Sequence, residues 1–359
     1  MATAKKKKTK ALGGAPIVHH ATGLIPRSPD PRDVPYAQVF GGPIIVDWSK
    51  TYDLGTLLTL IIEDQGASGS CVAQAWSKLA EIYSKLKYGK PLDVSARDIY
   101  WRGFIPPEGG MYGYKGGSIL KNNGSAREVD VVSYQNGNPP SEAFMRTQRQ
   151  DGLSAALDTK IPGYLYVQPI FDEMAHATEH NFAMVFGVTM SDEGWQTADV
   201  RPSLAGEKLY GHFLIAIGRC IRNGKHAIKF LNSWSKRWGD NGFGYINEEY
   251  FTNAGNVFGG YVIDDIPESY LPTINAMDVI FLQGTEDQFV VHGNKRHLIR
   301  DIESRDFLVE LGIILPSARS VAADEFARYE EGVPFPSVKV DQFAAEFYER
   351  ARDAFGSGK

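Results

Sequence analysis

The sequence predicts an α+β protein in which one long helix precedes a strand-rich region. Apolar residues recur at helical spacing from Val72 to Leu86, and Gly89 follows as a residue that ends helices. Further along the chain, short apolar runs have the length and composition of buried strands. These runs cover residues 182–189, 211–218 and 227–235. The order implies a helical half packed against a strand-rich half.

Composition places the chain among globular proteins. Of its 359 residues, 43% are hydrophobic and 23% are charged, which suffices for a buried core and is ordinary for a soluble domain. The formal net charge of −5 argues against an overall basic surface of the kind that binds nucleic acid. No run approaches the roughly 18 apolar residues that span a bilayer. We therefore expect neither a nucleic-acid partner nor a membrane span.

The first 42 residues differ in character from the rest. Residues 5–8 are all lysine, and residues 26–35 contain four prolines. Such a segment cannot bury enough apolar surface to fold alone, so residues 1–42 are expected to be extended or disordered. No long apolar segment typical of a secretory signal follows the lysines, and the chain has only two cysteines. Both observations favour a cytoplasmic protein.

Cys71 stands at the predicted N-terminus of the long helix. The helix dipole and the unpaired N–H groups of the first turn favour the thiolate, which is the nucleophilic form of cysteine. Gly66 and Gly69 allow the preceding loop to turn tightly. Gln65 lies six residues upstream and can offer its amide as a hydrogen-bond donor to an oxyanion.

A histidine and an asparagine lie at the ends of two predicted strands. His212 opens the run over 211–218, Asn232 lies in the run over 227–235, and the turn residues near 222–225 predict a hairpin between them. The asparagine oxygen can then orient the imidazole toward a thiol, with Trp234 shielding the bond from water. His212 follows Cys71 by 141 positions (212 − 71), within the spacing of roughly 130–150 known for such pairs.

At this point the chain resembles the papain-like cysteine peptidases. The resemblance rests on three ordered blocks and covers about residues 43–265. The matching blocks are residues 65–72 (QGASGSCV), 212–218 (HFLIAIG) and 231–243 (LNSWSKRWGDNGF). It implies a fold with a helical half and an antiparallel, β-barrel-like half, and a domain spanning residues 43–266.

The resemblance also implies roles for individual residues. Cys71 would be the nucleophile, His212 the general base and acid, and Asn232 the residue that orients the imidazole. Gln65 and the backbone N–H of Cys71 would form the oxyanion hole. The substrate backbone would lie along the paired glycines Gly116 and Gly117, in a predicted loop over 109–117 at the cleft edge, and Trp234 would also contact substrate. The implied partner is a peptide or protein substrate, and no cofactor or metal is implied.

Two positions depart from the family pattern. Ser68 replaces a cysteine that usually forms a disulfide beside the nucleophile, and Val72 replaces a tryptophan. With only Cys71 and Cys220 present, we expect no disulfide, and the loop before Cys71 would be held by packing alone. Cys220 is interpreted as a small buried hydrophobic residue. The pattern is closest to bacterial and archaeal members.

Further helices are expected at 95–101 and 173–180, and a change of composition after residue 266 marks a second module. Residues 267–338 are expected to form a small accessory module. It would contain a hairpin over 289–299 and short helices near 306–311 and 322–330. Residues 339–359 would carry a terminal amphipathic helix, because Phe343, Phe347 and Ala351 share one face.

Three alternative functions follow from the sequence. His176, Glu179 and His180 fit an inverted zinc-peptidase motif in which zinc activates water, although no third ligand is evident and a solvated helix face explains them as well. A member of the same fold that has lost catalysis would act as a binding module. A thiol acyltransferase of transglutaminase type would use the same three residues but pass the acyl group to an amine.

Overall fold

A computed structural model describes residues 21–27, 33–264, 277–299, 305 and 314–331, apart from short gaps at 59, 136, 148–158, 254, 284, 286, 293–294 and 328. The chain divides into two compact units, residues 1–270 and 271–359. The sequence predicted this boundary at residue 266.

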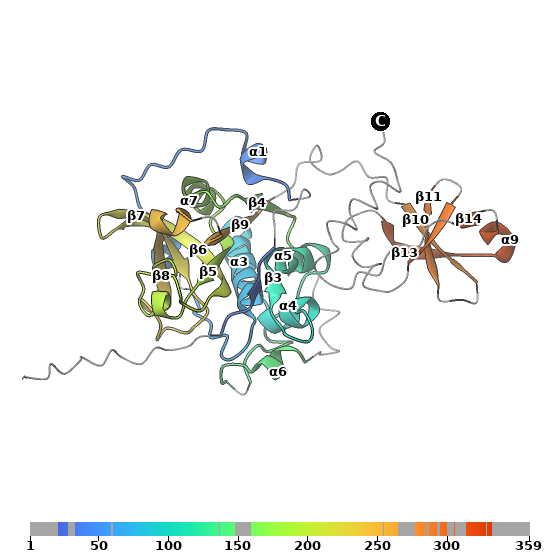
Figure 1. Cartoon of the computed structure of the whole chain (residues 1–359), viewed down its shortest axis with the longest axis horizontal. Helices are drawn as coiled ribbons and strands as arrows, with labels where there is room; N and C mark the ends of the chain where they lie inside the picture. The colour runs from blue at the N-terminus through green and yellow to red at the C-terminus, as the bar shows by residue number, and fades with distance from the viewer. Residues whose placement is uncertain are drawn as a thin grey trace, which may run out of the picture. The chain divides into compact units, whose positions relative to one another are not determined.

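The helical half of the first unit is built around α3 (Cys71–Tyr88). The helix ends where Gly89 adopts a left-handed conformation (φ 66°) and donates its N–H to carbonyls of the last turn, as predicted. Nearly all of the first three turns are buried. In Figure 1, α3 lies between the sheet and the helices α4 (Ala96–Gly103) and α5 (Gly113–Asn122).

The strand-rich half is one antiparallel sheet, which confirms the predicted α+β class. Its strand order is β4-β9-β5-β6-β7-β8, and β2 (Tyr52–Asp53) also pairs with β6. The strands are β4 (Tyr164–Val167), β5 (Met184–Met190), β6 (Tyr210–Arg222), β7 (Lys225–Leu231), β8 (Phe243–Asn247) and β9 (Val257–Ile263). The predicted runs at 182–189, 211–218 and 227–235 thus correspond to β5, β6 and β7.

Both faces of this sheet are buried, so its central strands are apolar at consecutive positions. On β6, Phe213 and Ile215 face the core shared with α3, whereas Leu214 and Ala216 face a second core. The second core is covered by α7 (Phe171–His180), the predicted helix at 173–180.

The hairpin between β6 and β7 closes with the predicted turn. Arg222 pairs with Lys225, and the two residues between them, Asn223 and Gly224, have positive φ angles of 52° and 76°. These are the requirements of a tight hairpin turn that matches the twist of the strands. The hairpin places the start of β6 and the end of β7 side by side, at the same end of the two strands.

The N-terminal segment differs from the prediction. Residues 1–20 and 28–32 lie outside the described residues, but the others are ordered on the body of the first unit. β1 (Leu24–Ile25) pairs in parallel with β3 (Met111–Tyr112), and α1 (Tyr36–Phe40) follows, with Tyr36 only 1% exposed. Residues 24–25 are extended, as predicted, but residues 36–40 are helical. The described residues are held on the body because the segment docks on an existing surface instead of needing a core of its own.

The second unit contains a sheet of order β13-β10-β11-β12-β14. Its elements are β10 (Met277–Leu282), β11 (Gln288–His292), β12 (Lys295–Ile299), β13 (Ile314–Val321), α9 (Ala323–Phe326) and β14 (Glu330–Glu331). The antiparallel β11–β12 pair is the predicted hairpin over 289–299. The predicted helix near 322–330 is limited to α9, while those at 306–311 and 339–359 lie outside the described residues.

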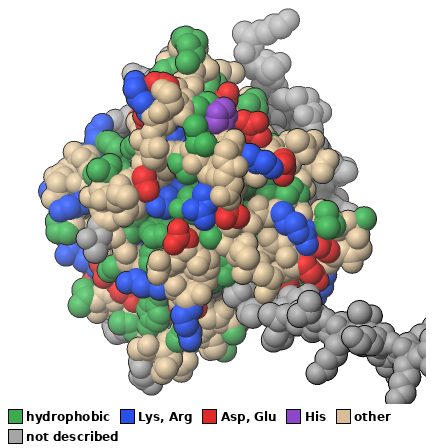
Figure 2. Space-filling view, turned by 90° about the vertical axis from the view of Figure 1, so that its left-hand side faces the viewer, with side chains coloured by type: hydrophobic (Ala, Val, Ile, Leu, Met, Phe, Trp, Pro, Cys, Tyr) green, Lys and Arg blue, Asp and Glu red, His purple; other side chains and the backbone are tan. Residues whose placement is uncertain are grey.

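Further short helices among the described residues of the first unit are α2 (Leu54–Leu57), α6 (Glu142–Met145) and two 3₁₀ turns, η3 (Glu193–Trp195) and η4 (Glu248–Phe251). On the face shown in Figure 2, acidic and basic side chains are interspersed with apolar ones. Among the described residues, no helix combines the length and the apolar character needed to cross a bilayer.

Replacing Gly116 with alanine is expected to destabilise the first unit. A Cβ at this position of α5 would lie 2.3 Å from Cδ1 of Trp76, a fully buried ring whose Nε1 donates to the Gly113 carbonyl at 2.7 Å. Overpacking of this kind costs about 1–3 kcal/mol, against a gain of at most about 1 kcal/mol in helix propensity. Urea unfolding should show a net loss of about 1 kcal/mol.

The control is Asn122→Ala, an exposed position in the same helix, for which the expected change is within about 0.5 kcal/mol. Equal stability of the Gly116→Ala and wild-type proteins would contradict the packing described for Trp76.

Candidate active site

Cys71 is fully buried at the first position of α3. Burial raises the pKa of its thiol to about 12, and the nearby backbone amides of Phe213, Gly23, Val72 and Leu24 act in the opposite direction. The helix terminus predicted a thiolate, but desolvation outweighs it in this state. Cys71 shares a buried cluster with Phe213, the residue that follows His212 on β6.

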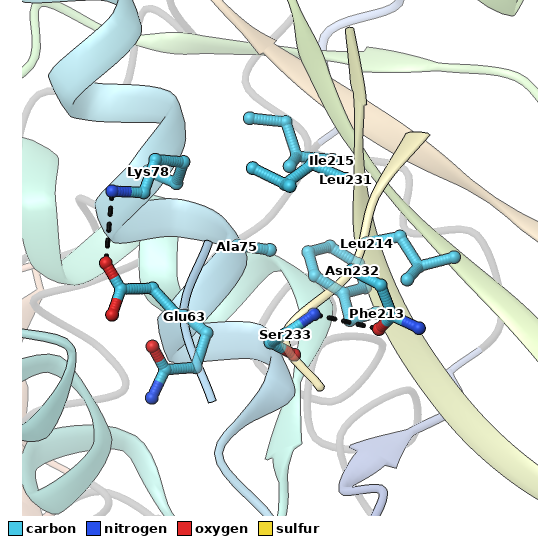
Figure 3. A pocket seen from close by; sticks show the side chains of 10 residues that line it. Glu63, Ala75, Lys78, Phe213, Leu214, Ile215, Leu231, Asn232 and Ser233 are labelled. Atoms are coloured by element: carbon cyan, nitrogen blue, oxygen red, sulfur yellow. Dashed lines mark hydrogen bonds and ion pairs between the residues drawn. The ribbon is translucent and has the colours of Figure 1, made fainter. Parts of the chain in front are cut away.

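His212 is held by the predicted asparagine. Its Nε2 lies 2.9 Å from Oδ1 of Asn232, and both residues are buried. The same Oδ1 accepts the backbone N–H of Ser233 at 2.8 Å, which fixes the amide orientation; this bond is marked in Figure 3. Because Nε2 bonds the amide oxygen, Nδ1 is the ring nitrogen available for exchange with a thiol.

Trp234 covers the imidazole, as the sequence predicted. The two rings stack at 4.5 Å with an interplanar angle of 16°. Trp195, which the sequence analysis did not single out, meets the same imidazole edge-on at 5.8 Å and packs on Trp234 and Trp238. The His212–Asn232 bond therefore lies within an aromatic cluster that keeps water out and strengthens it.

Gln65 is buried, with both ends of its amide held. Its Oε1 accepts from Oγ of Ser233 at 2.5 Å, and its Nε2 donates to the carbonyls of Ser68 at 2.8 Å and Ala21 at 3.0 Å. The two carbonyl partners settle the orientation of the amide, because a carbonyl oxygen can only accept a hydrogen bond. Nε2 is thus presented to a carbonyl oxygen, the geometry required of an oxyanion donor.

A buried lysine links α3 to the strand segment that precedes Gln65. Nζ of Lys78 lies 2.5 Å from Glu81 and 3.2 Å from Glu63, and Glu63 also accepts from the Tyr134 hydroxyl at 2.7 Å. Figure 3 shows Lys78 and Glu63 at one end of a small cavity that Asn232 lines at the other. Breaking a buried pair of this kind leaves an uncompensated charge, so the network holds the site rigidly.

The N-terminal segment occupies the cleft in front of Cys71. The Ala21 carbonyl accepts from Gln65 and, at 3.1 Å, from Nε1 of Trp234. The Gly23 carbonyl accepts the N–H of Met111 at 2.8 Å, and Gly23 and Leu24 cover the sulfur. The sequence left open whether this segment covers the cleft, since nothing in the sequence pattern of residues 21–27 marks a surface to which they bind.

The structure does not place Gly116 and Gly117 at the cleft. Both lie inside α5 against the ring of Trp76, so the prediction that they line the substrate path is wrong. The backbone in the cleft instead passes Gly110, where a Cβ would lie 2.6 Å from the Gly23 carbonyl oxygen and φ is +80°. Gly109–Gly110 is the glycine pair at the cleft edge, and the loop predicted over 109–117 ends where α5 begins.

The three residues of the zinc motif have other partners. Nδ1 of His176 bonds the Tyr36 hydroxyl at 2.8 Å, His180 packs on Phe40, and Glu179 pairs with Arg219 at 2.6 Å. The two histidine contacts anchor α1 on α7, and the Glu179–Arg219 pair joins α7 to β6. Within the described part of the chain, no group of three or more His, Cys, Asp or Glu side chains is arranged to hold a metal ion.

The loop before Cys71 is held by hydrogen bonds. Oγ of Ser68 donates to the Gln65 carbonyl and lies 2.7 Å from Oγ of Ser70. The expectation that packing alone holds this loop is therefore wrong. Both cysteines are free, and Cys220 is only partly buried.

Comparisons with known proteins agree with this geometry. The model of the papain family of cysteine proteases matches residues 43–257. Cysteine proteinase COT44 of Brassica napus is 23% identical over 250 residues, covering 64% of this chain and 67% of the relative. Chymopapain of Carica papaya is 26% identical over 222 residues, covering 60% and 57%. The chain thus spans about two thirds or less of the length of these curated relatives.

Solved structures show the same fold. Xylellain, a cysteine protease from Xylella fastidiosa, superposes with a TM-score of 0.57 at 21% identity, covering 68% of this chain and 96% of xylellain. The clostridial cysteine protease Cwp84 superposes with a TM-score of 0.51 at 17% identity, covering 60% and 58%.

Replacing Gly23 with alanine is expected to expose Cys71. A Cβ at Gly23 would lie 1.8 Å from the Gly69 carbonyl oxygen, where backbone faces backbone and neither side can yield. Displacing the segment hydrates the thiol and lowers its pKa, and each unit raises the thiolate fraction at neutral pH about tenfold. Alkylation of Cys71 by iodoacetamide at pH 7 should therefore accelerate at least about tenfold.

In the unvaried protein the alkylation rate should keep rising with pH well above 9, because a thiol with a raised pKa ionises only at high pH. The matched control is Thr22→Ser, and all proteins carry Cys220→Ser so that a single thiol reacts. Unchanged kinetics in the Gly23→Ala protein would show that residues 23–24 do not cover the sulfur.

Proposed function

Because this chain belongs to the papain family of cysteine proteases, we propose that it hydrolyses peptide bonds through a thioester on Cys71, assisted by His212 and Asn232. The observation that carries this proposal is the buried His212–Asn232 bond at the start of β6, next to the Phe213 amide that contacts the sulfur. Nucleophile, base and orienting group are all present.

In this mechanism Nδ1 of His212 takes the proton of Cys71. The thiolate attacks the carbonyl carbon of the scissile bond, and the imidazolium returns its proton to the leaving amine. Water then attacks the thioester with His212 again as base, which releases the acid and restores the thiol. Asn232 keeps the imidazole oriented throughout by accepting from Nε2.

Gln65 is proposed to stabilise the oxyanion of each tetrahedral intermediate. The position of the Ala21 carbonyl supports this role, because its oxygen already lies at hydrogen-bond distance from the Gln65 amide. A substrate carbonyl and Ala21 cannot use that donor at once. Hydrolysis therefore requires residues 21–25 to leave the cleft.

Acyl transfer to an amine uses the same three residues, so the triad does not distinguish the acceptor. A catalytically inactive binding module is the other alternative, and it requires that a complete triad and oxyanion donor have no chemical role. The cytoplasmic location stays a prediction.

Substitutions at the triad test the proposal. In a Gly23→Ala background that opens the cleft, Cys71→Ala and His212→Ala should each lower kcat/KM for a fluorogenic peptide by at least about 10³-fold. Gln65→Ala should lower kcat by about 10²–10³-fold, the cost of losing one oxyanion donor. Mass spectrometry of the rapidly quenched enzyme should detect a thioester on Cys71.

Cys220→Ala is the matched control and should leave kcat/KM unchanged, because this cysteine lies on β6 away from the triad. Repeating the assay with added amines separates hydrolysis from acyl transfer by product mass. Normal activity of the His212→Ala protein would refute the assigned base.

A further inference from the structure

We propose that Asp33, Tyr261 and Tyr114 form a binding site for a basic side chain of a peptide in the cleft, filled here by Arg27 of the chain's own N-terminal segment. The inference rests on the proposed function, because it takes the cleft to be a peptide-binding site. It names one feature of the peptides that the cleft accepts, an arginine or lysine a few residues from the reacting position.

The guanidinium of Arg27 contacts three different groups: a carboxylate, a hydroxyl and an aromatic ring. Its NH2 nitrogen lies 2.6 and 2.8 Å from the two oxygens of Asp33 and donates to the Tyr261 hydroxyl at 3.2 Å. Its central carbon lies 4.4 Å from the ring centroid of Tyr114. A carboxylate, a hydroxyl and an aromatic face together select a cation, and the charge-assisted bonds are the strong ones.

Two of the three recognition groups belong to the body of the first unit, because Tyr114 lies on α5 and Tyr261 on β9. Asp33 belongs to the N-terminal segment but precedes residues that have their own anchors. The Val34 carbonyl accepts the N–H of Tyr166 at 2.8 Å, and Tyr36 is buried against α7. These anchors do not depend on residues 21–27.

The occupied site favours a cation. With Arg27 in place the Asp33 side chain is only 10% exposed, and this low exposure to water strengthens the attraction between the carboxylate and the positive charge beside it. The negative charge of Asp33 also acts on two nearby tyrosines. Burial is the main reason that the pKa values of Tyr166 and Tyr261 are raised, and the charge of Asp33 is the second.

The site lies within reach of the reacting position. The backbone amide of Leu24 lies close enough to Cys71 to lower the pKa of its thiol, and Arg27 follows three residues later, about 10 Å along an extended chain. Leu24 itself contacts the body at Gly187, where an added Cβ would lie 2.7 Å from its side chain. An apolar contact and a cation site thus hold one peptide at two points.

Protection of Cys71 from iodoacetamide tests the site without requiring hydrolysis. In full-length protein carrying Cys220→Ser, Arg27→Gln should free the segment and accelerate labelling about tenfold or more, the cost of losing bonds to a charged partner. A synthetic peptide of residues 21–27, blocked at both ends, should then slow labelling again. The same peptide with glutamine in place of arginine should need about tenfold higher concentration.

In the Asp33→Asn protein, iodoacetamide should label Cys71 quickly, and the two peptides should slow this labelling equally. Arg27→Lys should keep most of the protection, because the charge remains. Arg222→Gln, which breaks an exposed ion pair with Asp199, is the matched control and should change nothing. Tyr114→Leu leaves the ion pair intact. In this variant the arginine peptide should need about threefold higher concentration to protect Cys71, and the glutamine peptide should be unaffected.

Equal protection of the Arg27→Gln protein by both peptides, or an arginine preference that survives Asp33→Asn, would overturn the proposal. Because alkylation needs only an accessible thiol, these outcomes are independent of whether the protein cleaves peptides. A protein that labels as expected but fails to hydrolyse any substrate would refute the proposed function and leave the basic site standing.

Discussion

The packing of α3 against β6 is the constraint on which the site depends. The helix buries its first three turns against the sheet, and this contact sets the N-terminus of α3 beside the start of β6. Cys71 and His212 are then brought together by two rigid elements and not by flexible loops. The tight hairpin that follows β6 brings Asn232, just after β7, next to His212 at the start of β6. The imidazole and the amide that bonds it therefore come from one end of two paired strands.

Much of this could be read from the sequence, because the relevant signals are local. Helical spacing and Gly89 determine α3, and Asn223–Gly224 determines the hairpin, so both elements agree with the prediction. The His212–Asn232 contact then follows from strand pairing. Of the two tryptophans that cover His212, only Trp234 was predicted, because it lies two residues after Asn232. Trp195 contacts the imidazole from a 3₁₀ turn that is distant in the sequence.

Features that depend on docking could not be predicted in this way. The segment 21–27 is poor in periodic apolar residues, and its order comes from the cleft in which it lies. Gly116 and Gly117 illustrate a second limit. A glycine pair can accommodate a passing backbone or a buried ring, and only the position of Trp76 shows that these two do the latter. The raised pKa of Cys71 likewise depends on tertiary structure, since it reflects burial of the thiol, which no local sequence pattern encodes.

The serine hydroxyls before Cys71 have one further consequence. Where related enzymes carry a covalent sulfur bridge, this chain has the hydrogen-bonded pair Ser68–Ser70, closed onto the Gln65 carbonyl. Thiol reagents such as dithiothreitol, which maintain a nucleophilic cysteine, therefore have no second sulfur to attack in this loop. The geometry around the nucleophile should be the same across the whole range of redox potentials that leave Cys71 reduced.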